Sequence, residues 1–418
     1  MSNDSKQIYV SLELGLNDIR VLVSEYYSTR FNIIRNESYP SDAISDFKIV
    51  DRKALVNNIT YAIKDTSAKI GAQIEKVILV LPAYNFKRFT LRSSIIPENG
   101  VVRKDDIIRA VSNSLKAKID DGVMVVNPVV TKYTVNGIST RRMPEKEISD
   151  DVVADIDLLC CDKQMAYDYV SVVEEAGIKV LDITLNSYCI AKESSLIEES
   201  LKKNIIILDI EKEVTYLSLL SKGKLISCET IFEGLAKIAR PVKSIYELSD
   251  NDLYKLVKFN VDYDSKYPDD TVYAISRDSK TSVITTKKLN DLVKDSLNDY
   301  AENIITMCKP IMENGADLIV TGEGEQMKAL VNILKEKNNG NCRLYYPDTI
   351  GVRDPSLTAL YGSFIVYREK AVMNNLSVNC INLLEYDTSV KDKDFDADGD
   401  TITSKIKSLF KQYVKGDQ

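Results

Sequence analysis

Residues 204–220, NIIILDIEKEVTYLSLL, decide the fold that we predict for this chain. The stretch holds two apolar runs, Ile205–Leu208 and Tyr216–Leu220, and the first run leads directly to the acid Asp209. The segment between the runs is polar and includes Glu211-Lys212-Glu213. Two short apolar runs around a polar turn predict a pair of strands joined by a tight turn. Asp209 would then stand at the tip of the first strand.

The same pattern occurs once more near the N-terminus. Residues 8–15, IYVSLELG, form an apolar run that ends close to the acid Glu13, and the apolar run Ile19–Val23 follows. We therefore predict that one supersecondary unit, a hairpin with an acid at its tip, is used twice in the chain.

Composition places the chain among globular proteins with more than one subdomain. A chain of 418 residues is longer than one hydrophobic core ordinarily supports. Its composition, with 44% hydrophobic and 28% charged residues, is typical of a soluble protein. The net charge of −7 argues against a nucleic-acid partner. The N-terminus, MSNDSKQ, lacks the apolar core of a signal peptide, and no apolar run is long enough to span a bilayer. The sequence predicts a cytoplasmic location.

Composition also excludes several kinds of chemistry. The chain contains no His, which excludes Ser-His-Asp and Cys-His catalysis and imidazole metal sites. Its seven Cys are scattered and lie mostly in apolar runs, so we expect reduced thiols rather than disulfides or a zinc site. We expect no catalytic residue and no metal ligand set.

The order of predicted elements indicates a mixed sheet interrupted by a small insert. Strands at 8–14, 19–27 and 31–37, a helix over 52–70 and a buried strand at 77–81 form a first unit that Pro82 ends. Residues 84–162 follow another pattern, with strand-like stretches around a helix at 104–117, and predict an α+β insert. Further helices are predicted at 164–176, 187–201, 250–259, 288–312, 326–337 and 355–368. A strand at 317–321 ends at Gly322-Glu323-Gly324, where glycines would let the backbone approach a neighbour closely.

The C-terminal residues differ from the rest of the chain. Residues 385–400 carry seven acids and two Lys, which predicts a flexible, self-repelling linker. In the tail after it, six apolar residues share a sector of roughly 140° on a helix; they are Ile402, Ile406, Leu409, Phe410, Tyr413 and Val414. Lys405 and Lys407 flank this sector, and Lys411 and Lys415 lie opposite it. An amphipathic helix with basic flanks predicts an interfacial membrane anchor, and docking on its own domain or in a partner's groove is the alternative.

These motifs together resemble the FtsA family of bacterial actin-like cell division proteins over nearly the whole chain. The residues that carry the resemblance are Ser11–Gly15 through Val23, Gly100–Val102 with Asp105–Ile107, Tyr133–Gly137, Val320–Gly324, and Asp354–Ser356 with Ala359 and Gly362. The linker and the amphipathic end complete it. The position of the insert distinguishes FtsA from chaperone ATPases and from MreB. The resemblance implies an actin-like, duplicated ribonuclease H-like α/β ATPase fold with an α+β insert subdomain and a C-terminal amphipathic helix on a flexible linker.

The resemblance also implies the domain boundaries. The first actin-like subdomain would comprise 1–83, completed by about 163–200 and 370–384, and the insert would comprise 84–162. The second actin-like subdomain would comprise 201–235 and 306–369, with a small subdomain at 236–305. An acidic linker at 385–401 and a membrane-targeting helix at 402–418 would follow. The implied membrane-binding residues are Ile402, Ile406, Lys407, Leu409, Phe410, Lys411, Tyr413 and Val414.

By the same resemblance, the chain would hold ATP and magnesium between its two halves. The implied nucleotide-binding residues are Glu13, Gly15, Asn17, Asp209, Thr215, Gly322 and Gly324. The chain departs from the family there: Glu13 replaces an Asp, Asp18 replaces a Lys, Glu211-Lys212-Glu213 replaces three glycines, Tyr216 replaces an Asp, and Glu323 replaces a glycine. Side chains at glycine positions obstruct the approach of backbone amides to phosphate, and added carboxylates repel it.

The function that the resemblance implies is a polymerising adaptor, a peripheral protein on the cytoplasmic side of the cell membrane. It would tether the FtsZ ring to anionic lipid, contact FtsZ through 236–305, and use the insert for self-association or for other division proteins. The alternatives are an ATPase or kinase of the actin-like superfamily, or a pilus-assembly relative of the same fold. Because the glycine turns are lost, an enzyme is the less favoured reading.

Overall fold

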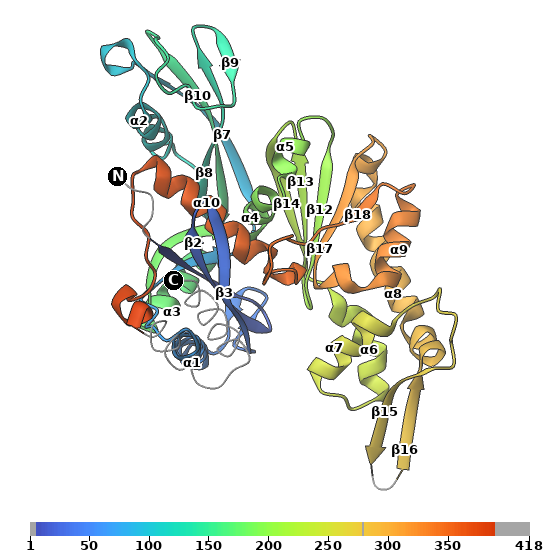
Figure 1. Cartoon of the computed structure of the whole chain (residues 1–418). Coiled ribbons are helices and arrows are strands. Elements are labelled where there is room, and N and C mark those ends of the chain that lie inside the picture. Colours follow the sequence, from blue (N-terminus) through green and yellow to red (C-terminus); the bar gives the residue numbers. More distant parts are fainter. Residues whose placement is uncertain (1–5, 278–279, 389–418) are drawn as a thin grey trace, which may run out of the picture.

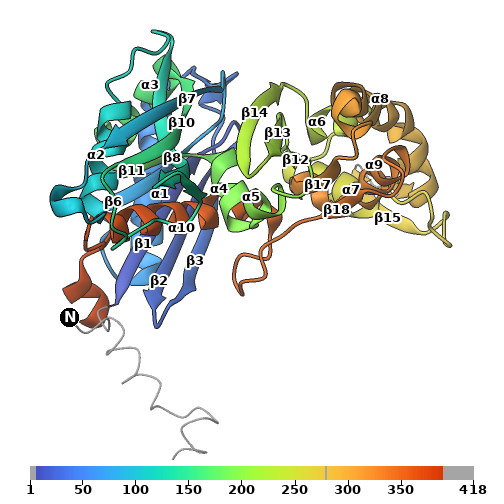
Figure 2. The ribbon, with the colours of Figure 1, turned by 90° about the horizontal axis from the view of Figure 1, so that it is seen from above.

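The computed structural model describes residues 6–277 and 280–388. The predicted membrane-targeting helix and the linker beyond residue 388 lie outside these residues. Figures 1 and 2 show two lobes side by side, with the insert extending from one and a small subdomain from the other. Within the described ranges, no helix combines the length and apolarity that crossing a bilayer requires.

The first lobe is built on a five-stranded sheet in the order β11-β6-β1-β2-β3. Its strands are β1 (Gln7–Leu14), β2 (Asp18–Tyr27), β3 (Arg30–Pro40), β6 (Lys76–Leu81) and β11 (Lys179–Leu185). A short pair, β4 (Ile44–Ser45) and β5 (Lys48–Ile49), follows β3. Helices α1 (Arg52–Ile70) and α3 (Lys163–Glu175) pack on each other and on this sheet, and α10 (Thr358–Met373) packs on β1 and β6. Residues near both ends of the chain therefore complete one lobe.

The second lobe repeats the arrangement of the first. Its sheet has the order β14-β13-β12-β17-β18. The strands are β12 (Ile205–Ile210), β13 (Thr215–Ser221), β14 (Lys224–Ile231), β17 (Asp317–Gly322) and β18 (Cys342–Leu344). In each lobe a hairpin, β1-β2 or β12-β13, carries a parallel strand beside its first member, β6 or β17. The duplication predicted from the two apolar hairpins is confirmed.

The insert lies between β6 and α3, as the sequence predicted. It is an antiparallel sheet in the order β7-β10-β8-β9 with a core of its own. The elements are β7 (Lys87–Ile95), η1 (Glu98–Gly100), α2 (Lys104–Ser114), β8 (Val123–Val135), β9 (Ile138–Thr140) and β10 (Val152–Asp162). The helix ends three residues earlier than the predicted 104–117.

The small subdomain follows β14 along the chain and lies at the far end of the second lobe (Figure 1). It contains α6 (Leu235–Ile245), α7 (Asp250–Asn260), the hairpin β15 (Thr271–Arg277) and β16 (Lys280–Thr285), and α8 (Thr286–Met312). Helix α8 packs on α6 and α9 (Lys328–Lys337), so the subdomain and the second lobe share one apolar core.

Two predicted helices are divided. The helix predicted at 187–201 is α4 (Asn186–Glu193) and α5 (Leu196–Glu199), because Ser195 between them has a φ of 56°, outside the helical range. The helix predicted at 355–368 begins as η3 (Pro355–Leu357) before α10. A further short helix, η2 (Glu323–Gln326), follows β17 at the predicted glycine turn.

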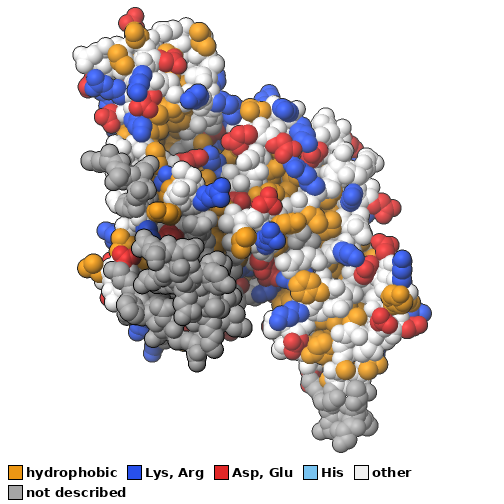
Figure 3. Space-filling model, viewed as in Figure 1, with side chains coloured by type: hydrophobic (Ala, Val, Ile, Leu, Met, Phe, Trp, Pro, Cys, Tyr) orange, Lys and Arg blue, Asp and Glu red, His pale blue; other side chains and the backbone are white. Residues whose placement is uncertain are grey.

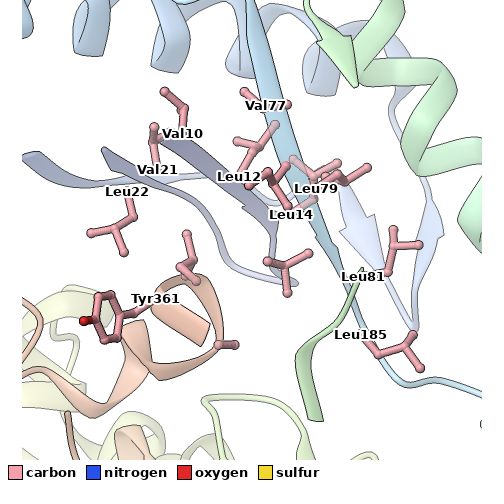
Figure 4. Packing of buried hydrophobic residues seen from close by; sticks show 14 of the residues in the cluster. Val10, Leu12, Leu14, Val21, Leu22, Val77, Leu79, Leu81, Leu185 and Tyr361 are labelled. Atoms are coloured by element: carbon pink, nitrogen blue, oxygen red, sulfur yellow. The ribbon is translucent and has the colours of Figure 1, made fainter. Parts of the chain in front are cut away.

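Dense apolar packing holds the strands of the first lobe in register. Figure 4 shows Val10, Leu12 and Leu14 of β1 among Val77, Leu79 and Leu81 of β6, with side chains of β2, β11 and α10 around them. Burying a side chain of this size contributes about 1.5–3 kcal/mol. The polar residues at the carboxyl end of β1 and the start of β2 are therefore presented from a rigid support.

Candidate functional site

The tips of the two hairpins meet between the lobes. A cavity of about 40 Å³ remains there. It is lined by Glu13, Leu14, Gly15, Leu16, Asn17, Asp18, Arg20, Phe47, Pro82, Asp209, Glu211, Lys212, Glu213, Val214 and Tyr216. Such a volume holds about three water molecules, whereas pockets for small-molecule ligands measure about 300–1,000 Å³.

The guanidinium of Arg20 occupies the centre of this contact. Arg20 lies on β2 with its side chain 8% exposed. It donates to both carboxylate oxygens of Glu211 on the opposite lobe, at 3.2 Å from Nη1 and 2.5 Å from Nη2. It also donates from Nε to Asp18, at 3.1 Å, and from Nη1 to the carbonyl of Ser356, at 3.3 Å. A bidentate arginine–carboxylate pair is among the strongest side-chain contacts, so Arg20 joins the two lobes directly.

The ion pairs continue into the small subdomain. Glu323 in η2 lies 3.8 Å from Nη2 of Arg20 and accepts from Lys258 of α7 at 2.9 Å. Lys212 lies 3.6 Å from the same carboxylate. We call this group the ionic cluster; its members are Glu13, Asp18, Arg20, Asp209, Glu211, Lys212, Lys258 and Glu323. The cluster connects the first lobe, the second lobe and the small subdomain at one point.

Burial raises the pKa of two acids in the ionic cluster. Burial raises the pKa of Glu13 to about 8 although Arg20 lies 3.6 Å away, because that cation is shared with other carboxylates. Burial, with Glu211 and Glu13 nearby, raises the pKa of Asp209 well above its usual value. The raised pKa values favour the protonated forms of Glu13 and Asp209, which reduces the negative charge that Arg20, Lys212 and Lys258 must offset.

The other carboxylates of the cluster each contact a cation, which favours their ionised forms. Burial opposes ionisation of Asp18, but Arg20 and Lys212 outweigh it and lower the pKa of that carboxyl. Burial likewise opposes ionisation of Glu323, and Lys258, Arg20 and Lys212 lower its pKa. The bidentate contact with Arg20 favours the ionised form of Glu211, although burial raises its pKa.

Aromatic side chains close one side of the cavity. Phe47 stacks on Tyr84 with ring centres 4.9 Å apart and lies 6.2 Å from Tyr216 and 5.7 Å from Phe232. These rings come from both lobes, so the contact between the lobes is apolar on this side and ionic on the other.

The structure brings most of the predicted site residues together. Glu13, Gly15, Asn17 and Asp209 all line the cavity. Thr215 lies apart, because its hydroxyl is buried against the Glu233 carbonyl at 2.8 Å and the Tyr300 hydroxyl at 2.5 Å.

Gly322 and Gly324, which the resemblance implies as nucleotide-binding residues, serve packing in this structure. A Cβ at Gly322 would lie 2.5 Å from an Asp209 carboxylate oxygen, and a Cβ at Gly324 would lie 2.6 Å from the side chain of Ile210. Because Gly322 and Gly324 have no side chain, η2 can pack directly on the end of β12. The same approach brings Glu323, which lies between them, into reach of Arg20.

Arg20 is the central residue that sequence reasoning missed. Its partners Glu211 and Glu323 were identified only as replacements of glycines. The available signal was a charged residue inside the apolar run Ile19–Val23, since a buried arginine requires ionised partners.

The residues present do not fit a nucleoside triphosphate with magnesium. The Arg20 side chain and its carboxylate partners line the space between the hairpin tips, and about 40 Å³ remains there. Within the described ranges, no group of three or more acidic or Cys side chains has the arrangement of a metal site. A polyphosphate would also bring several negative charges beside carboxylates that already neutralise the available cations.

Replacing Glu13 with Gln is expected to stabilise the protein more at pH 9 than at pH 5. The folded protein holds a proton on Glu13 up to about pH 8, whereas the unfolded chain releases it near 4.5. The wild type therefore loses stability as pH rises from about 4.5 to about 8, and Gln, which does not titrate, removes this loss of a few kcal/mol. Urea denaturation of both proteins at both pH values measures the difference.

The comparison isolates Glu13 because Asp18, Asp209 and Glu211, which face it, are present in both proteins. An equal stability difference between the two proteins at pH 5 and pH 9 would refute the raised pKa of Glu13.

Sequence comparisons find relatives among cell division proteins. Cell division protein FtsA of Bacillus subtilis is 22% identical over 361 residues, which cover 84% of this chain and 81% of that protein. FtsA of Enterococcus hirae is 22% identical over 364 residues, with the same shares covered. FtsA of Staphylococcus epidermidis strain RP62A is 21% identical over 403 residues, 93% of this chain and 85% of that protein. No family model matches the chain.

Two solved structures have a similar fold. A chain of the PilM-PilN type IV pilus biogenesis complex aligns with a TM-score of 0.57 at 11% identity, over 86% of this chain and 98% of that chain. MreB5 of Spiroplasma citri bound to ADP aligns with a TM-score of 0.51 at 13% identity, over 88% of this chain and 98% of that chain. These comparisons confirm the predicted actin-like fold, and the sequence similarity across most of the chain confirms its resemblance to the FtsA cell division proteins.

Proposed function

We propose that this chain is an FtsA-like adaptor that tethers FtsZ to the cytoplasmic face of the cell membrane. The observation that carries the proposal is the sequence similarity to FtsA over 84% or more of the chain. The insert between β6 and α3 supports it, because this placement was expected from the FtsA resemblance. The amphipathic pattern of residues 402–418 would supply the membrane contact.

In this proposal the adaptor works without nucleotide. The MreB5 structure with a similar fold is bound to ADP, whereas here Arg20 joins the two lobes through Glu211. Arg20 is part of the chain, so in this proposal it joins the lobes whether or not ATP is present.

The FtsZ contact is proposed on the small subdomain. A groove of about 410 Å³ lies between the loop that precedes β15 and helix α8. It is lined by Asp262, Tyr263, Ser265, Pro268, Lys287, Asn290, Asp291, Lys294, Asn298 and Ile333. Exposed Lys287 and Lys294 on one wall would pair with acids of a bound segment, and half-exposed Tyr263 would pack on its apolar side chains.

Recruitment of FtsZ to anionic liposomes tests the proposal. We expect purified FtsZ to sediment with the liposomes only when the full-length chain is present. The double substitution Lys287→Glu and Lys294→Glu should reduce co-sedimentation at least about tenfold, since it reverses two charges of the groove. The control is Lys309→Glu with Lys335→Glu, exposed residues of α8 and α9 outside the groove. FtsZ that stays in the supernatant with the wild-type chain would contradict the adaptor function.

Self-association is proposed for the insert. Ile96, Ile138 and Ile148 are exposed by 76%, 73% and 79% and all lie in this subdomain. Figure 3 shows hydrophobic side chains among positive and negative ones on the insert and on the other described parts of this face. Exposed large apolar side chains support a protein contact at the insert.

A further inference from the structure

An apolar groove lies beside the point where the described chain ends. Its volume is about 900 Å³. It runs between the second half of α1, the turn after α1, the turn between α3 and β11, and the last described residues. The apolar lining comprises Ile63, Ala68, Ala72, Ile74, Ala176, Ile178 and Leu384. Leu384 is 82% exposed, although it is among the larger apolar side chains of this wall.

The exit of the chain is fixed to this groove. The carboxylate of Glu385 accepts from the backbone of Gln73 at 2.9 Å, and the backbone of Asn382 donates to the carbonyl of Gln73 at 3.1 Å. Thr388, the last described residue, itself lines the groove. The segment that follows therefore starts at the groove wall.

The C-terminal tail has the length and pattern to occupy the groove. Residues 389–401 would separate Thr388 from the amphipathic segment 402–418, and a flexible linker of this length spans about 20 Å on average and about 45 Å at most. At such tether lengths the effective concentration of the tail near the groove is of millimolar order. The six apolar residues on one face of the tail match the apolar lining of the groove.

Charge around the groove favours the same occupant. The tail carries Lys405, Lys407, Lys411 and Lys415. Glu385 lines the groove, Asp387 follows in the same segment, and Glu174 lies just before the lining turn 176–178, next to Glu175, which pairs with Arg52 at 2.9 Å. Lys64 is the lining cation. Exposed carboxylates on both sides of an apolar groove suit a basic amphipathic helix.

We propose that the groove binds the chain's own C-terminal segment, residues 402–418, when no membrane is present. The inference rests on the membrane-tether function proposed above. Groove and lipid would bind the same apolar face of the tail, so the two states exclude each other. Docking then lowers membrane affinity by the fraction of molecules in which the tail is free. The protein would release its anchor only where anionic lipid competes successfully.

Disulfide trapping tests the docking directly. The variant Ala68→Cys with Leu409→Cys places one thiol in the groove and one on the apolar face of the tail. The seven native Cys are free and buried, so they contribute little background. Under mild oxidation we expect an intramolecular disulfide in solution and suppression of it by phosphatidylglycerol vesicles. The control pair, Asn57→Cys with Leu409→Cys, uses an exposed position on α1 about 16 Å from residue 68.

If the disulfide between residues 68 and 409 forms no faster than the disulfide of the control pair, the proposal is wrong. A disulfide between two chains would also overturn it and would indicate that the tail docks onto a second copy. A second variant, Ala68→Trp, fills the groove at an exposed position and is expected to raise vesicle affinity about 3–10-fold. Unchanged affinity would also count against docking. If neither the wild type nor the Ala68→Trp variant binds vesicles, the tether function is refuted instead. Disulfide formation between residues 68 and 409 would still show whether the tail docks in the groove.

Discussion

Substitution of Arg20 by Ala is expected to lower the free energy of unfolding by about 3–5 kcal/mol. Removing one partner of a buried ion pair has this cost because it leaves the other charge buried without compensation. Here Glu211 would lose its bidentate partner and Asp18 its Nε contact, both in the contact between the lobes. Chemical denaturation of the wild type and the variant measures the change.

The matched control is Arg35→Ala in the neighbouring strand β3. Arg35 is also an arginine paired with a glutamate, Glu37, at 2.5 Å, but its side chain is 46% exposed. Exposed ion pairs contribute about 0–1 kcal/mol, so this variant should be nearly as stable as the wild type. Equal effects of the two substitutions would mean that the ionic cluster does not hold the lobes together.

Substitution of Leu409 and Phe410 by Asp is expected to weaken binding to anionic vesicles about 100-fold. Each side chain of this size contributes about 1.5–3 kcal/mol when it leaves water, and the pair together exceeds the roughly 2.7 kcal/mol that a factor of 100 requires. Vesicle co-sedimentation measures the change.

Deletion of residues 416–418 is the control for the membrane prediction. It removes the end of the chain and leaves the six apolar residues of the tail in place. Membrane binding that survives the two Asp substitutions would show that another surface carries the tether.

The two lobes could be predicted because the strands of each lobe have a local apolar pattern in the sequence. The runs Ile205–Leu208 and Ile19–Val23 predict strands wherever they occur, since their side chains must be buried. The two hairpins and the insert follow from such runs and their order. The break at Ser195 could not be predicted, because one residue with positive φ leaves the apolar pattern of the helix unchanged.

The ionic cluster depends on contacts that no local pattern contains. Arg20 and Glu211 are 191 residues apart, and only the packing of two separate sheets brings them together. From the sequence, Glu211 and Glu323 predict repulsion of phosphate. The structure adds that the same carboxylates bind an arginine, so the cleft is filled as well as negatively charged. The carboxylates that replace the family's glycines are therefore the same ones that pair with the buried arginine.

Calorimetric titration of the full-length protein with magnesium-ATP tests the central claim, that Arg20 rather than nucleotide joins the two lobes. With about 40 Å³ between the hairpin tips and the cations already paired, we predict no saturable heat at nucleotide concentrations up to about 1 mM, which corresponds to less than about 4 kcal/mol of binding. Saturable binding in the micromolar range would contradict the account, because it would require Arg20 to leave its partners and the lobes to separate.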